Sequence, residues 1–134
     1  MALYILDTDI LSYVLGKNPD VVSALKHTLS NNDTVILCPV VSYEIRRGLL
    51  HKDASNKLEF FEQLVATLVW DDLQRVDWET ASQIWADCER NGQHSNDADI
   101  LIASHAIRHG AKVVTNNLTH FAHLGVQLEN WRDT

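Results

Sequence analysis

Short apolar runs alternate along this chain with stretches that have the spacing of amphipathic helices. The runs are bounded by turn residues and predict strands at residues 3–6, 34–38, 113–114 and 126–129, with an extended piece near 73–76. Between the runs, apolar residues recur every three or four positions. They predict helices at residues 10–15, 19–29, 40–50, 58–68, around 81–88, and 96–110.

The last of these helices has the clearest ends. Asn96 and Asp99 have the spacing of an N-cap and a residue that reaches back to it, and Gly110 is a good helix stop. The residues between are almost wholly apolar, so this helix is covered on more than one side. Helices that alternate with short apolar strands predict one α/β domain over residues 1–134. We expect a three-layer α/β/α sandwich with a short, mostly parallel central sheet.

Composition narrows the class of protein. The 134 residues are 46% hydrophobic and 22% charged, as in an ordinary globular domain. The net charge of −7 argues against a general nucleic-acid coat protein, but not against a nuclease, whose metal site is itself acidic. Cys38 and Cys88 have apolar neighbours and no pairing pattern, so we interpret them as reduced core thiols of a cytoplasmic protein. We expect no signal peptide and no membrane segment.

Several acidic side chains are predicted to meet at one edge of the sheet. Asp7 ends the first strand, Glu44 lies early in the helix after the second, and Asp99 lies in the first turn of the apolar helix. Residues 115–117, Thr-Asn-Asn, follow the next strand. With right-handed crossovers, these points share the carboxyl edge, where open α/β sheets bind ligands.

Each acid also has an ordinary structural role open to it. Asp7 or Asp9 can cap the following helix, Asp99 can complete the cap begun at Asn96, and Glu44 can pair with an arginine. One cap does not need two acids, however, and several carboxylates on an apolar-walled edge repel one another unless a cation lies among them. Hard oxygen ligands without a Cys or His cluster favour Mg²⁺ or Mn²⁺ over zinc.

Histidines and arginines give weaker signals. His105 and His109 are four apart on a predicted helix, but no Glu lies between them as in zinc peptidases, so we interpret them as structural. Arg46 and Arg47, with two lysines nearby, form the one dense basic group. This group is either a solvated helix face or a surface that contacts phosphate.

Four blocks of sequence together resemble the PIN-domain ribonucleases of the VapC toxin type. They are LDTDILS at residues 6–12, VSYEIRRG at 41–48, DILIASHA at 99–106 and VTNNLTHF at 114–121. Residues 126–131, VQLENW, resemble the closing strand and Glu-Asn-Trp tail of that family. Any single block is weak, but their order and spacing extend the resemblance over nearly the whole chain.

The resemblance implies a metal-dependent endoribonuclease that hydrolyses RNA, with transfer RNA as the commonest expectation. It implies that Asp7, Glu44 and Asp99 hold Mg²⁺ (or Mn²⁺) and carry the catalysis. Support for water or phosphate is expected from Thr8, Asp9, Asp97, Thr115, Asn116 and Asn117, and RNA contacts from Arg46 and Arg47.

Three positions depart from the family pattern. Asn117 stands where a fourth acid is often found, and many relatives carry Asn where Asp9 stands. His120 occupies a position that is usually acidic. These departures leave open whether the site holds one metal ion or two.

The resemblance also implies partners. We expect a homodimer that joins a small VapB-type antitoxin in a hetero-oligomer. The helices at 40–50 and 58–68 carry more apolar residues than one sheet face needs. A groove between them is predicted to receive an apolar antitoxin helix, with a basic residue reaching the acids.

Other classes of function stay open as alternatives. An inactive PIN-like module would bind without cutting, although the three acids are intact. A haloacid-dehalogenase-type phosphatase would use Asp7 and Asp9, but Leu11 stands where that family has Thr or Val. A phospho-acceptor receiver domain needs a lysine after its last strand, where this chain offers only Arg132.

Overall fold

The computed structural model describes residues 1–132, and its strands form a single parallel sheet in the order β3-β2-β1-β4-β5. All four strand pairings are parallel, and Ile5 in the central strand lies between Ile36 and Val113. The sheet is thus wholly parallel where a mostly parallel one was predicted. The strands are β1 Leu3–Leu6, β2 Thr34–Leu37, β3 Val69–Trp70, β4 Lys112–Val114 and β5 Leu128–Glu129.

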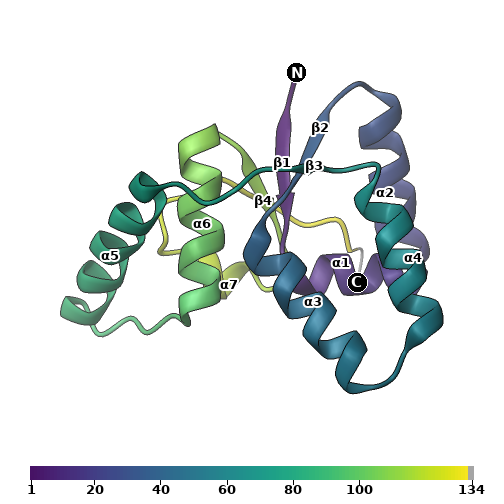
Figure 1. Ribbon diagram of the computed structural model, residues 1–134. Coiled ribbons are helices and arrows are strands. Elements are labelled where there is room, and N and C mark those ends of the chain that lie inside the picture. The colour runs from purple at the N-terminus through teal and green to yellow at the C-terminus, as the bar shows by residue number, and fades with distance from the viewer. Residues whose placement is uncertain (133–134) are drawn as a thin grey trace.

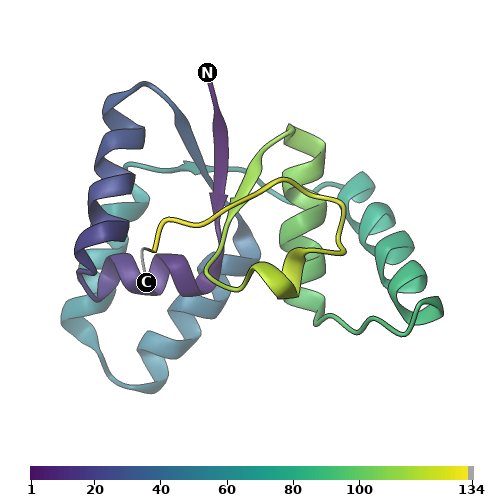
Figure 2. The same ribbon diagram turned by 180° about the vertical axis from the view of Figure 1, so that it is seen from behind.

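Helices cover both faces of this sheet and complete the predicted three-layer α/β/α sandwich. In Figure 1, α5 and α6 lie on one side of the strands, and α2, α3 and α4 lie on the other. The reverse view shows α7 beside α6 and α1 beside α2 (Figure 2). The helices are α1 Thr8–Leu15, α2 Pro19–Ser30, α3 Pro39–His51, α4 Ser55–Val65, α5 Arg75–Arg90, α6 Asp97–His109 and α7 Leu118–Phe121. None of the helices within residues 1–132 is long and apolar enough to cross a membrane.

Helix α6 lies between the sheet and α5, which explains the apolar run at residues 100–103 of its sequence. Ile102, Ala103 and Ala106 are buried, and the two alanines allow the helix to approach its neighbours closely. Burying a side chain such as Ile102 contributes about 1.5–3 kcal/mol. Gly110 ends the helix in the left-handed conformation, with φ of 62°.

The extended piece predicted near residues 73–76 is wrong for residues 75 and 76, which are helical. The third strand lies earlier, at Val69–Trp70, where it pairs with the end of β2. Residues 75 and 76 belong to α5, because Gln74 and Asp77 form a capping box. In it, the backbone N–H of Gln74 donates to Asp77 Oδ2 at 2.8 Å.

Two other boundaries moved, and one helix was missed. Helix α4 runs from Ser55 to Val65 instead of 58–68, because the backbone N–H and the hydroxyl of Thr67 both donate to the Leu64 carbonyl and end it. The last strand is shorter than the predicted 126–129. The four-residue helix α7 was not predicted, since it is too short to show helical periodicity.

The ends of β1, β2 and β4 share one edge of the sheet, where α1, α3 and α6 begin (lower edge in Figure 1). The backbone N–H of Asp7 donates to the Val114 carbonyl at 3.0 Å, which holds the first residue after β1 against the end of β4. This is the edge on which the sequence analysis placed the acids.

We expect Asn96→Ala to lower the free energy of unfolding by about 1 kcal/mol. Asn96 Oδ1 accepts the backbone N–H of Asp99 at 2.8 Å, and that donor has no helical partner. Urea denaturation measures the change. Asn56→Ala, at an exposed position in α4, is the control and should change stability by less than about 0.5 kcal/mol. Equal stability of Asn96→Ala and the wild type would mean that water replaces the cap without cost.

Candidate active site

Asp7 is a nearly buried carboxylate, 4% exposed, at the end of the central strand. It caps α1, because Oδ1 accepts the backbone N–H of Ile10 at 2.8 Å. Burial raises the pKa of Asp7 to about 6. Hydrogen bonds from Thr115 and Ile10 lower the pKa, and the nearby charges of Asp9 and Asp99 raise it. The capping role is therefore real, but a cap alone does not require a carboxylate so poorly solvated.

Glu44 projects from the second turn of α3 toward the start of α1. Its Oε1 accepts the Thr8 hydroxyl at 2.5 Å, and its Oε2 lies 3.6 Å from Arg47 Nη2. The ion pair that was considered as an alternative role is present, but more than half of the Arg47 side chain is exposed, so the pair is weak. Glu44 is thus held beside Asp7 by the residue that follows Asp7.

Asp99 occupies the first turn of α6, over the same edge. Burial raises its pKa, the charge of His120 lowers it, and the charges of Glu44 and Asp9 raise it. Asp99 therefore lies within electrostatic reach of acids from α1 and α3. His120, on α7, was not among the predicted site residues. The sequence signal that could have identified His120 was its position in the block at residues 114–121, where the family usually has an acid.

These acids form an open cluster and not a closed cage. The charges of Asp9 and Asp99 raise the pKa of Asp7, and the charge of Glu44 raises the pKa of Asp99. Within residues 1–132, no three of their carboxylates have oxygens that all lie within 4.8 Å of one another. The donors are carboxylate, amide and hydroxyl oxygens, which fit Mg²⁺ or Mn²⁺ that keeps several of its waters.

Asn117 and Asp9 are paired across the cluster. The Asn117 amide nitrogen donates to Asp9 Oδ2 at 2.5 Å, and the backbone N–H of Asn117 donates to the Thr115 hydroxyl at 2.9 Å. Because Thr115 also hydrogen-bonds Asp7, the segment after β4 connects the two aspartates. Thr8, Asp9, Thr115 and Asn117 are therefore all beside the acids.

Three predicted residues point elsewhere. Asp97 lines a hollow between α5 and α6, where its neighbours include Trp78 and Trp85. Arg46 forms an ion pair with Glu62 on α4. The side-chain oxygen of Asn116 accepts the Asn130 amide at 3.2 Å.

Two hollows meet at Glu44, one on each side of α3. The first lies between α3 and the start of α6 and is lined by Pro39, Val40, Tyr43, Glu44, Arg47, Asn96, Ala98 and Leu101. The second lies among α1, α3 and α4, and its lining includes Thr8, Ser12, Glu44, Leu49, Lys52 and Lys57. The acid cluster thus has an arginine on one side and two lysines on the other.

Comparison with known proteins identifies the family. The PIN domain family model matches residues 4–126, and the chain belongs to this family. It is 29% identical to Ribonuclease VapC2 of Rickettsia felis over 135 residues, which covers 96% of this chain and 98% of the relative.

Two solved structures agree with this assignment. VapBC2 from Rickettsia felis, bound to a DNA fragment from its promoter, has a TM-score of 0.85 at 29% identity and covers 97% of this chain and 99% of its own. DNA-bound VapBC from Salmonella typhimurium has a TM-score of 0.89 at 25% identity, with 98% and 100% covered. These matches confirm the resemblance drawn from the four sequence blocks.

We expect Asp7→Asn to stabilise the protein at neutral pH when a chelator is present. The folded-state pKa of Asp7, about 6, lies above the unfolded value of about 4. The protonated carboxyl therefore favours folding below pH 4, and this contribution is lost as the pH rises through 6. Asp7→Asn should exceed the wild-type free energy of unfolding by about 1–3 kcal/mol at pH 7.5.

Urea denaturation between pH 4 and 8 measures this difference, which should shrink toward pH 4. Glu59→Gln, an exposed change on α4, is the control and should show no such trend. A difference that stays constant over the whole pH range would contradict the assignment of the raised pKa to Asp7.

Proposed function

We propose that this protein is an endoribonuclease toxin of the VapC type that hydrolyses RNA in the cytoplasm and is neutralised by a VapB-type antitoxin. The observation that carries the proposal is the gathering of Asp7, Glu44 and Asp99 at the carboxyl edge of a PIN fold. The ribonuclease name of the Rickettsia felis relative supports the activity. Transfer RNA is the substrate class that we propose.

Asp7 and Asp99 would hold a divalent ion, Mg²⁺ or Mn²⁺, with Glu44 bound directly or through water. When bound, such an ion lowers the pKa of a coordinated water and offsets charge on the phosphate. The buried, like-charged surroundings of Asp7 support this role, because a cation offsets both the burial, which is the main cause of its raised pKa, and the repulsion from Asp9 and Asp99.

The protein's own groups would orient the substrate and the attacking water. Glu44, fixed by the Thr8 hydroxyl, is placed to accept a proton from that water. Asn117 has its amide nitrogen on Asp9, which leaves its side-chain oxygen free to face water or the ion. The N-terminus of α6 adds a partial positive charge beside a phosphate, a modest effect.

The RNA backbone would follow the two hollows that meet at Glu44. Arg47 lines one of them, and Lys52 and Lys57 line the other, so cations flank the acids on both sides. Arg46 lines neither hollow and is not part of the surface that we propose.

We expect the purified protein to cut RNA when Mg²⁺ or Mn²⁺ is supplied, leaving 5′-phosphate and 3′-hydroxyl ends, because water is the nucleophile. Asp99→Asn should reduce cleavage by at least 100-fold, whereas Asp97→Asn, two residues away and facing α5, should reduce it less than about fivefold. Gel assays with end-labelled RNA measure both variants.

This pair of variants controls for a general change of charge at the start of α6. Chelator should abolish cleavage in the wild type. Products that end in 2′,3′-cyclic phosphate and form in chelator would show that the RNA 2′-hydroxyl attacks instead.

The antitoxin would bind in the hollow among α1, α3 and α4. Leu15 and Leu49 form part of the apolar lining of this hollow, and Thr8 and Glu44 line its end beside the acids. An apolar helix placed there would bring a basic side chain to the acids, which fits the net charge of −7. The solved VapBC complexes support a partner of this kind, and we propose that a dimer of this chain assembles with it.

We expect co-expression with the cognate antitoxin to remove both toxicity and nuclease activity. Leu49→Glu, on the apolar wall of the proposed hollow, should weaken antitoxin binding by at least tenfold. Pull-down assays measure this binding. Because the same hollow is proposed for the RNA backbone, cleavage assays on the same preparations measure separately how far the change affects the RNA. Full neutralisation of Leu49→Glu at wild-type affinity would place the antitoxin on another surface.

A further inference from the structure

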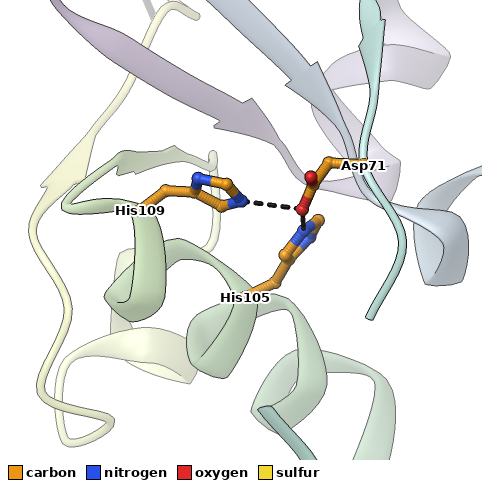
Figure 3. Close-up of side chains that lie close together, drawn as sticks. All are labelled: Asp71, His105 and His109. Atoms are coloured by element: carbon orange, nitrogen blue, oxygen red, sulfur yellow. Dashed lines mark hydrogen bonds and ion pairs between the residues drawn. The ribbon is translucent and has the colours of Figure 1, made fainter. Parts of the chain in front are cut away.

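A second group of ligand-type side chains meets at the end of α6 that is opposite the acids. Asp71 follows β3, and its Oδ2 lies 2.8 Å from His105 Nε2 and 2.7 Å from His109 Nε2 (Figure 3). Within residues 1–132, no other set of three His, Cys, Asp or Glu side chains brings its ligand atoms within 4.8 Å of one another. At 1.5 Å per residue, these histidines lie about 9 and 15 Å along the helix from Asp99.

We propose that Asp71, His105 and His109 bind a borderline divalent transition-metal ion such as Zn²⁺ at a site separate from the acid cluster. Two imidazole nitrogens and one carboxylate oxygen are a ligand set that suits zinc better than Mg²⁺. The four-residue spacing puts both rings on one face of α6. Figure 3 shows both rings turned toward the Asp71 carboxylate.

The site is walled on one side and open on the other. His105 is fully buried, while His109 is 22% and Asp71 30% exposed, so an ion and a water ligand can enter from solvent. Ligand atoms of a tetrahedral zinc ion lie about 3.3 Å apart, given bonds of about 2.0–2.1 Å. Asp71 Oδ2 is slightly closer than this to each imidazole nitrogen, and the partly exposed side chains of Asp71 and His109 have room to move apart.

Arg108 is the group with which an ion would compete. Its Nη2 donates to Asp71 Oδ2 at 2.7 Å, and its Nε donates to both oxygens of buried Asp77, at 2.8 and 3.1 Å. If an ion takes Asp71, Arg108 keeps Asp77 and the Asp72 carbonyl. Two carboxylates and one guanidinium carry a net charge of −1, which favours a divalent cation.

His105 limits how tightly the ion is held. Its Nδ1 is buried and has no hydrogen-bond partner among the described residues. Coordination through Nε2 puts the proton on Nδ1, whereas zinc-binding histidines usually donate that proton to an acceptor. The lack of such an acceptor weakens metal binding by about 10- to 100-fold.

The test uses tag-free protein in excess Mg²⁺, so that oxygen-only sites are occupied. Calorimetric titration with Zn²⁺ should give one ion per chain, and Co²⁺ should give the intense visible bands of four-coordinate nitrogen and oxygen ligation. His109→Gln should weaken binding at least tenfold. His27→Gln, at an exposed position on α2, should not change it.

Asp99→Asn tests whether Zn²⁺ binds at the acid cluster instead. If the two sites are separate, this variant should bind Zn²⁺ like the wild type. Circular dichroism checks that each variant is folded. Asp71→Asn repeats the binding test at the carboxylate ligand that follows β3. Wild-type affinity in folded His109→Gln would overturn the proposal. So would loss of binding in Asp99→Asn, or weak octahedral Co²⁺ bands in the wild type.

Discussion

The burial of the Asp7 carboxylate at the end of the central strand is the constraint on which the site depends. β1 lies between β2 and β4, so the residue that follows it is enclosed by the ends of its neighbours. The fold leaves this charge poorly solvated and then surrounds it with hydrogen-bond donors, the Ile10 backbone and the Thr115 hydroxyl. Stability is thereby given up at a point where a cation can restore it.

The pairing of Asp9 with Asn117 shows how the site departs from its family without losing a carboxylate. The resemblance leads one to expect an amide at the first position and an acid at the second. Here the two chemical groups are exchanged, and the amide of Asn117 donates to Asp9. A carboxylate at both positions would place two negative charges in contact, and the amide of Asn117 avoids this repulsion.

Local signals were enough to predict β1, β2 and β4, α6 and the position of the acids at one edge of the sheet, because strand ends, caps and helical spacing are all read over a few residues. Asp97 was included only as possible support, because residues two apart on a helix do not share a face, and its side chain lines the hollow between α5 and α6. The contact of Asp71 with His105 and His109 was missed. It depends on how the segment after β3 crosses α6, a long-range arrangement with no local pattern.

The two edge strands of the sheet, β3 and β5, are each two residues long. Short edges leave few unpaired backbone groups, which is one way in which proteins prevent strands of neighbouring molecules from adding to a sheet. Growth of the sheet from one copy into the next is therefore disfavoured at both sides. In the helical layers, by contrast, two large apolar side chains meet solvent, since Trp78 and Trp85 of α5 are half exposed.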